Sequence, residues 1–199
     1  MRYSIRTVGP LPPDEDIEGV IDLEEAKQHL NVDHDADDAL IVAQVLAAQD
    51  FVEQFTSRIL TPRVMEMSFD GFPGPPGEIL LPREPVTGVL SLIYTDPEGV
   101  AQTLDNADWR WDEFEPGLVR PAFGTSWPSA AEERGSFRLQ FEAGYDIGLA
   151  PASLVAAVKL LLGTLYGQRE SVVVGPIVND LPGGVAALCR PYRRLGISC

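Results

Sequence analysis

The sequence predicts an α+β protein with a helical core, an inserted small antiparallel β-sandwich or barrel, and a C-terminal tail. Three observations predict it. Apolar residues recur with helical spacing between residues 23 and 60, short strand-like runs fill residues 63–145, and a strongly apolar helical segment follows Pro151. Two N-terminal helices and one long helix of the C-terminal half should form the helical core. The expected parts are an N-terminal helical part at 1–62, the β-region at 63–148, the completing helix with its following loop at 149–180, and the tail at 181–199.

The second predicted helix, residues 40–60, carries two apolar rows. The first row steps by four and three residues, which is one face of an α-helix; it contains Ile41, Val45, Ala48, Val52, Phe55 and Ile59. The second row lies beside it and contains Leu40, Ala43, Ala47 and Phe51. So wide an apolar surface can serve the domain core on one side and an adjacent subunit on the other. A well-buried core helix of a monomer explains the stripe equally well.

Start and stop signals define both N-terminal helices. Asp22 with Glu25 three positions later has the spacing of a capping box, and Asn31 follows the last turn of the first helix. Asp35 is the expected N-cap of the second helix, and Pro62 marks its end.

The β-region consists of short runs separated by turns. The expected strands cover residues 64–69, 78–82, 86–95, 100–104, 109–114 and 136–145. Alternation is clearest in the last strand, where Phe137, Leu139 and Phe141 share one face. Residues 96–99, Asp-Pro-Glu-Gly, form a turn between two of these strands.

The C-terminal half contains an apolar helix from Ser153 to Tyr166 and then a segment of different charge. Gly163 and Gly167 have a spacing that indicates close helix packing. No acid follows Asp180, while three arginines stand near the C-terminus. Because it differs in charge from the rest of an acidic chain, the segment from residue 181 is expected to be poorly held by its own domain. A solvated basic end is the simpler alternative.

Charge and cysteine content exclude several classes of protein. The formal net charge of −15 argues against non-specific binding to nucleic acid or to an anionic membrane. Thirteen acids stand between Asp14 and Glu53 against Lys27 alone. Cys189 and Cys199 lack metal-ligand spacing, and with no signal peptide or membrane anchor evident, synthesis in a reducing cytoplasm is expected.

No constellation of residues predicts catalysis, a cofactor or a metal. Asp33, Asp35 and Asp37 are spaced like the start of a calcium loop, but Asp38 replaces the required glycine and Gln44 the required glutamate. Helix capping explains the aspartates better. The competing hypothesis is a soluble carbohydrate-binding module or hydrolase built on the β-region, with sugar-stacking platforms at Trp109, Trp111 and Trp127. Aromatic residues in strands are more often part of a core.

The order of four segments resembles the head-tail connector (adaptor) family of long-tailed phages, which includes the adaptors of phage-like gene transfer agents. The segments are residues 23–60, LPREPVTGVLSLIYTDPEG at 81–99, APASLVAAVKLLLGTLYGQRE at 150–170, and LPGGVAALCRPYRRL at 181–195. None is a catalytic signature, so the resemblance rests on the whole arrangement. The acidic, proline-rich leader at 10–19 departs from the family pattern.

The resemblance implies a structural subunit and not an enzyme. Its copies would form a ring, expected to be dodecameric, beneath the portal of a DNA-filled capsid in the neck of a virion or phage-like particle. The implied partners are the portal protein, a tail-side stopper or terminator protein, and DNA that passes through the lumen without specific binding. No membrane is involved.

Three groups of residues are assigned on this basis. The portal-binding candidates are Leu188, Arg190, Tyr192, Arg193 and Arg194. The ring-interface candidates, taken from the apolar helices, are Ile41, Val45, Phe51, Val52, Leu161 and Leu165. The lumen candidates, where like charge would keep DNA from sticking, are Asp33, Asp35, Asp37 and Asp38.

Overall fold

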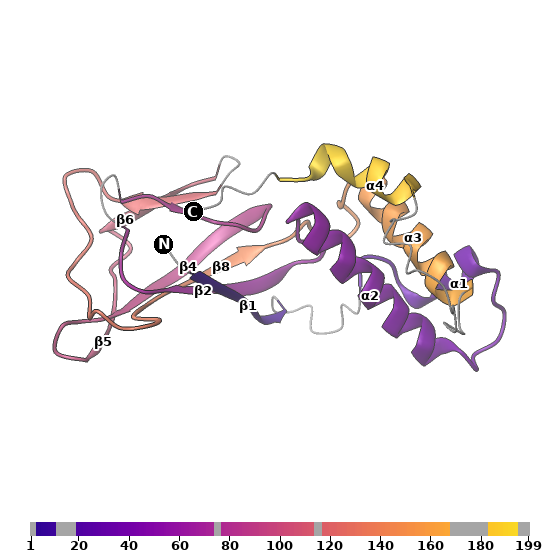
Figure 1. Ribbon diagram of the computed structural model, residues 1–199, viewed down its shortest axis with the longest axis horizontal. Coiled ribbons are helices and arrows are strands. Elements are labelled where there is room, and N and C mark those ends of the chain that lie inside the picture. Colours follow the sequence, from indigo (N-terminus) through magenta and orange to yellow (C-terminus); the bar gives the residue numbers. More distant parts are fainter. Residues whose placement is uncertain (1–2, 11–18, 74–76, 114–116, 168–182, 195–199) are drawn as a thin grey trace, which may run out of the picture. The chain divides into compact units, whose positions relative to one another are not determined.

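The computed structural model describes residues 3–10, 19–73, 77–113, 117–167 and 183–194 (Figure 1). The chain divides into two compact units, which we describe separately. The β unit contains β1 (Tyr3–Pro10) and the strands between Pro62 and Gly144, and the helical unit contains the four α-helices. The observed division differs from the expected one at the N-terminus, because residues 3–10 form a strand of the β unit and not part of 1–62 as a helical segment.

The β unit consists of two antiparallel sheets. The five-stranded sheet has the order β1-β2-β8-β4-β5, and its further strands are β2 (Arg63–Phe69), β8 (Phe137–Ala143), β4 (Val86–Thr95) and β5 (Ala101–Thr103). The three-stranded sheet has the order β3-β7-β6, formed by β3 (Ile79–Leu80), β7 (Leu118–Pro121) and β6 (Trp109–Asp112). The predicted antiparallel insertion is therefore confirmed.

Alternation along the central strand β8 creates the core of the β unit. Phe137, Leu139 and Phe141 are fully buried, and the residues between them lie on the opposite face. Their register partners on β2 are Phe69, Met67 and Met65, which are buried too. The aromatic rings of Phe69 and Phe137 meet at a centroid distance of 4.4 Å. One apolar face on each strand thus fixes the register of the sheet.

Two strands escaped prediction from the sequence. β1 reads YSIRTVGP, in which polar and charged residues interrupt the apolar ones, and none of its described side chains is buried. β7 spans only four residues, Leu118–Pro121, and pairs with β6, of four residues, and with β3, of two. β1 has no buried apolar face, and β7 is too short to show alternation although its Val119 is fully buried.

The helical unit is organised around α3 (Ala152–Gly167). α1 (Leu23–Leu30), α2 (Asp38–Thr56) and α4 (Gly183–Cys189) all pack against it. A short 3₁₀ turn, η1 (Arg190–Tyr192), follows α4. The buried core draws on every helix and contains Ile21, Ala26, Ile41, Val45, Ala48, Val52, Leu60, Leu154, Ala157, Val158, Leu161, Leu162, Val185 and Cys189.

The helix ends confirm one predicted cap and correct another. The Asp22 carboxylate accepts a hydrogen bond of 2.7 Å from the Glu25 amide, and Asn31 takes the left-handed conformation at the end of α1. The predicted N-cap Asp35 is wrong, because α2 begins at Asp38 with Asp37 as its N-cap residue, and no side chain caps it. α2 also ends earlier than expected, at Thr56, where Ser57 turns the chain with a φ of 61°.

The glycine pair of α3 does not mark a close helix contact, contrary to prediction. A Cβ atom added to Gly163 would meet only the His29 ring nitrogen at 3.8 Å, and one added to Gly167 would meet nothing within 4 Å. Among the described helices, none is long and apolar enough to cross a membrane.

Candidate assembly surface

The first apolar row of α2 is buried in the core of the helical unit. Ile41, Val45 and Val52 are at most 4% exposed, and Leu161 of α3, which belongs to the same core, is 9% exposed. These four ring-interface candidates are therefore corrected: their side chains face neighbouring helices of the same chain. No surface remains on them for a second subunit.

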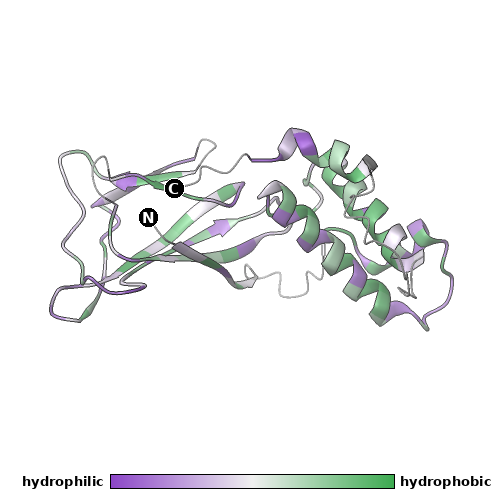
Figure 2. Cartoon of the chain, in the orientation of Figure 1, coloured by the Kyte–Doolittle hydropathy of each residue, from purple (hydrophilic) through white to green (hydrophobic). Residues whose placement is uncertain are grey.

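The second apolar row of α2 is exposed to solvent. Leu40, Ala43, Ala47 and Phe51, which we call the outer row, are all exposed, at 40% for Leu40 and 41% for Phe51. Their spacing of three, four and four residues places them together on one side of the helix, away from the buried row. Figure 2 shows apolar residues along α2 and α3. The outer row is thus a continuous apolar strip that the helical unit leaves uncovered.

Among the ring-interface candidates, Phe51 and Leu165 are exposed. Leu165 lies near the end of α3 at 40% exposure, and its carbonyl oxygen accepts a hydrogen bond of 3.3 Å from the Gln44 amide of α2. This bond ties the end of α3 to α2. Of the two, only Phe51 belongs to the outer row.

The C-terminal segment is part of the helical core, which corrects the prediction of a poorly held tail. Val185 and Cys189 of α4 are fully buried, and the portal candidates Leu188 and Tyr192 pack partly against the same core. Burial raises the pKa of the Cys189 thiol. The apolar spacing of residues 185, 188, 189 and 192 accounts for this packing, and the basic character of the segment obscured it. Residues 195–199 lie outside the described part of the chain.

Four arginines gather where α4 and η1 reach the end of α2, and we call Arg58, Arg190, Arg193 and Arg194 the arginine cluster. The Arg194 amide donates to the Thr56 carbonyl at 3.1 Å, and the Arg58 Nε donates to the Tyr192 carbonyl at 3.4 Å. These bonds fasten the segment after α4 to the C-terminal end of α2, where helix carbonyls favour positive charge. Arg58 precedes the other three by more than 130 residues in the sequence, and the fold brings it to the same end of α2.

An aromatic pair joins the arginine cluster to the outer row. Phe51 and Phe55 stack with ring centroids 6.4 Å apart, and the Arg193 guanidinium lies 5.1 Å from the Phe55 ring centroid. A cation over an aromatic face is held by the ring quadrupole. The surface of α2 therefore changes along its length from an apolar strip to a basic end.

The lumen candidates form a bonded loop between α1 and α2. Lys27 donates to Asp35 at 2.7 Å and to Asp38 at 2.9 Å, while Asp37 accepts a hydrogen bond of 2.8 Å from Tyr166. The bond to Asp35 is the main cause that raises the pKa of Lys27, and the same bond lowers the pKa of Asp35. Part of the acidic charge is thus offset within the loop. Asp33 is exposed.

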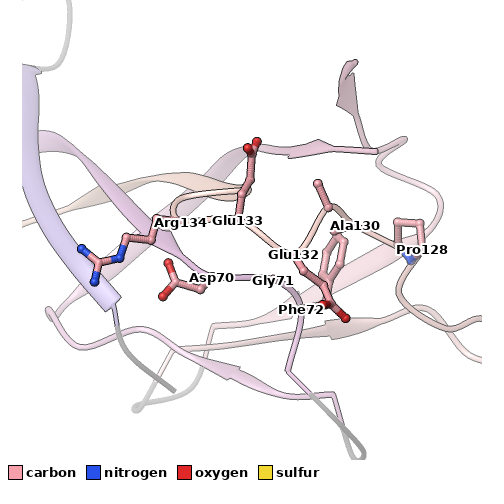
Figure 3. A pocket seen from close by; sticks show the side chains of 9 residues that line it. Asp70, Gly71, Phe72, Pro128, Ala130, Glu132, Glu133 and Arg134 are labelled. Carbon is pink, nitrogen blue, oxygen red and sulfur yellow. The ribbon is translucent and has the colours of Figure 1, made fainter. Parts of the chain in front are cut away.

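The β unit contains a cleft of about 610 Å³ beside the turn after β2. Figure 3 shows that the carboxylates of Asp70, Glu132 and Glu133 point in different directions instead of converging on one point. All three are exposed, and Phe72 at the floor stacks on Trp127 at 5.1 Å. Trp127 also donates to the Gly77 carbonyl at 2.6 Å, so it serves the fold. The cleft offers no paired carboxylates and no free aromatic platform, which leaves the carbohydrate hypothesis without support.

No group of three or more metal-ligating side chains occurs in the residues that the structure describes. Three surface features stand out in the described residues: the outer row, the arginine cluster and the acidic loop.

Comparison with known proteins gives a family match for part of the chain. Residues 20–106 match the family model of phage gp6-like head-tail connector proteins. This match covers α1, α2 and the strands β2 to β5. No curated protein matches the sequence.

Solved structures with the same fold come from gene transfer agent (GTA) particles. A chain in the virion of a native particle aligns with a TM-score of 0.76 and 24% identity, covering 97% of this chain and 96% of that one. A chain in the neck of an empty particle with C6 symmetry gives 0.75 and 23%, over 98% and 97% of the two chains. One in the neck of a native particle with C12 symmetry gives 0.72 and 23%, again over 98% and 97%. The chain thus matches the gp6-like head-tail connector family over residues 20–106 and has, over nearly its whole length, the fold of a chain from GTA particle necks.

Proposed function

We propose that this chain is a structural head-tail connector subunit, not an enzyme, whose copies form a ring in the neck of a virion or phage-like particle. The ring would join the portal of a DNA-filled capsid to a tail-side stopper or terminator protein, and DNA would pass through it. The observation that carries this proposal is the family match over residues 20–106. The symmetric GTA necks that contain similar chains support a ring, and C12 symmetry favours twelve copies.

The outer row of α2 is the proposed ring interface. Its exposed leucine and phenylalanine flank two alanines, Ala43 and Ala47, which let a neighbouring element approach the helix closely. In a ring the contact is heterologous, so the outer row of each copy meets a different surface on the next one. Exposed apolar strips of this kind mark protein interfaces more often than they mark solvent-facing surfaces.

A charge in the middle of the outer row tests the interface. Ala47→Glu keeps good helix propensity but places a carboxylate where an apolar contact is proposed. Ala152→Glu at the exposed start of α3 is the matched control with the same change in charge. Native mass measurement, alone and with an isolated portal, should show loss of rings for Ala47→Glu and none for the control. Rings of unchanged abundance in Ala47→Glu would reject the outer row as the interface.

The arginine cluster, with Leu188 and Tyr192 beside it, is the proposed portal contact. Arg190 and Arg193 are exposed, and the chain is otherwise strongly acidic, so these residues suit an acidic portal surface. A ring multiplies a modest contact through effective concentration.

Charge reversal tests this contact without truncating the core. Arg190→Glu with Arg193→Glu should weaken portal binding at least tenfold and reduce its salt dependence. The control is Arg110→Glu with Arg134→Glu, two exposed arginines of the β unit with the same total charge change. Equal loss of binding in both double variants would show a general effect of net charge instead of a specific contact.

The acidic loop at Asp33–Asp38 is the proposed wall of the DNA passage. Like charge keeps a duplex from adhering as it moves, and no specific binding to DNA is expected. Asp33→Lys with Asp35→Lys should make assembled rings retain DNA in a gel-shift experiment at low salt. If neither wild-type rings nor rings of the double variant retain DNA, the loop does not line the passage.

A further inference from the structure

The N-terminal strand β1 contributes little to the core of the β unit. None of the described side chains from Tyr3 to Gly9 is buried, and Tyr3 and Val8 are 44% and 50% exposed. Ile5 and Gly9 are half-buried. Apolar burial therefore supplies only a small part of what holds this strand in place.

Backbone pairing and polar side-chain contacts hold β1 instead, among them a weak hydrogen bond of 3.6 Å from the Thr7 hydroxyl to the Met65 sulfur. The strand makes seven register pairs with β2, from Tyr3 opposite Phe69 to Pro10 opposite Arg63. The Ser4 and Ser68 hydroxyls lie 2.7 Å apart, and Arg6 binds Glu66 at 2.6 Å. This is the manner in which an added strand binds a sheet edge, where main-chain hydrogen bonds give most of the affinity.

The face of β1 that carries Ser4 and Arg6 is exposed. A hollow of about 280 Å³ lies over this face of β1, β2 and β8 and is lined by Ser4, Arg6, Glu66, Ser68, Gly135 and Arg138. Its lining contains no apolar side chain, so no apolar packing covers β1 on this side.

We propose that, within the ring, β1 of one copy pairs with β2 of the adjacent copy. The inference rests on the proposed ring. Every contact just described is between β1 and the rest of the β unit, so a β1 supplied by an identical neighbour reproduces all of them. Exchange therefore loses no contact. The ring keeps neighbours at high effective concentration, and each exchanged strand links two subunits without new interface chemistry.

The connection to the helical unit limits the reach of β1. Eight residues, 11–18, form this connection, and eight residues can span at most roughly 27 Å. Exchange therefore requires an adjacent copy whose β2 lies within that reach. The proposed occupant of the β2 edge is a second copy of this chain, because an identical strand reproduces every contact just described.

A designed disulfide between Ser4 and Ser68 reports the partner of β1. The two residues are directly opposite, a position whose Cα separation of about 5 Å suits a disulfide. The test chain carries Ser4→Cys and Ser68→Cys with Cys199→Ser, while buried Cys189 is retained. Assembled rings are oxidised and run on a denaturing gel without reductant. Exchange gives a ladder of covalent oligomers, whereas intramolecular pairing gives monomers only and overturns the proposal.

Mixed rings remove the remaining ambiguity. Chains with only Ser4→Cys and chains with only Ser68→Cys, distinguished by tags of different size, are assembled together. A disulfide between the two tagged forms then requires exchange, because neither chain can form it alone. Native mass measurement on the same samples separates the two hypotheses. Rings without the mixed disulfide overturn strand exchange alone, and the absence of rings overturns the proposed ring and, with it, the exchange.

Discussion

The two ends of the described chain are held in different ways. Strand β1 at the N-terminus pairs along its backbone with β2, and none of its described side chains is buried, whereas α4 near the C-terminus buries Val185 and Cys189 completely. Releasing β1 would expose little apolar surface to water, but releasing α4 would expose side chains that are fully buried. This difference is the reason that we propose exchange for β1 and not for α4.

Among the changes that test this comparison, truncation after Leu181 should have the largest effect on stability. It removes Val185 and Cys189 from the core, together with the partial packing of Leu188 and Tyr192. The expected loss is roughly 3 kcal/mol or more in the stability of the helical unit, from the lost apolar burial. Urea unfolding followed by circular dichroism at 222 nm, a signal dominated by the helices, would measure this loss.

Deletion of residues 1–10 is the matched change at the other end. All three tryptophans, Trp109, Trp111 and Trp127, lie in the β unit, so fluorescence follows that unit alone. This deletion should shift the fluorescence transition and leave the helical transition in place, and the C-terminal truncation should do the reverse. A helical transition that is unchanged after truncation would contradict the role of α4 in the core.

The sequence predicted the elements with periodic apolar residues and missed those defined by pairing. The first row of α2 and the alternation of β8 revealed a helix and a strand because one face of each is buried. β1 and β7 carry no such pattern. β1 has no buried face and pairs with β2, more than 50 residues later in the chain, and β7 has only four residues. The packing of α4 was hidden by the arginines beside its apolar positions.

The proposed ring interface was also only partly predictable from the sequence. Both apolar rows of α2 could be recognised, but which row faces the core depends on α3, more than 100 residues later in the chain. Four ring-interface candidates were therefore taken from the buried side, and Phe51 is the one that belongs to the exposed row. The width of an apolar stripe can be read from the sequence. Which side of the stripe faces solvent depends on the elements that pack against the helix.

Substitution of one valine in α4 and one in β1 compares the two ends of the chain at the level of single side chains. Val185→Ala in α4 should cost about 2 kcal/mol, because it removes fully buried methyl groups and leaves a cavity. Val8→Ala in β1, where the side chain is half in solvent, should change stability by no more than about 0.5 kcal/mol. Urea unfolding followed by circular dichroism for the first and by fluorescence for the second measures both. Equal costs would mean that β1 is anchored by packing after all.

The smallest expected effect concerns the charge that holds β1. Burial raises the pKa of Glu66, but hydrogen bonds from Gln140 and Arg6 and the charges of Arg6 and Arg138 outweigh it, so the pKa lies below its ordinary value of 4.5. A carboxylate whose pKa is lower in the folded state stabilises the fold above pH 4.5. That stabilisation is lost as the pH falls through the folded pKa.

Arg6→Gln should raise the pKa of Glu66 and lower stability at pH 7 by only about 0.5 kcal/mol, because the Arg6 side chain is 71% exposed and its charge is screened. The gap between wild type and variant should close as the pH falls through the folded pKa of Glu66, which lies below its ordinary value, because the carboxyl group is then protonated in both. Fluorescence-detected urea unfolding between pH 7 and pH 3 measures it, with Arg110→Gln on β6 as the control for loss of one exposed arginine. A gap that stays constant across this range would show that Arg6 holds β1 through its packing and not through its charge. In that case the strand would be more firmly seated, and its exchange between copies less favourable, than its exposed side chains indicate.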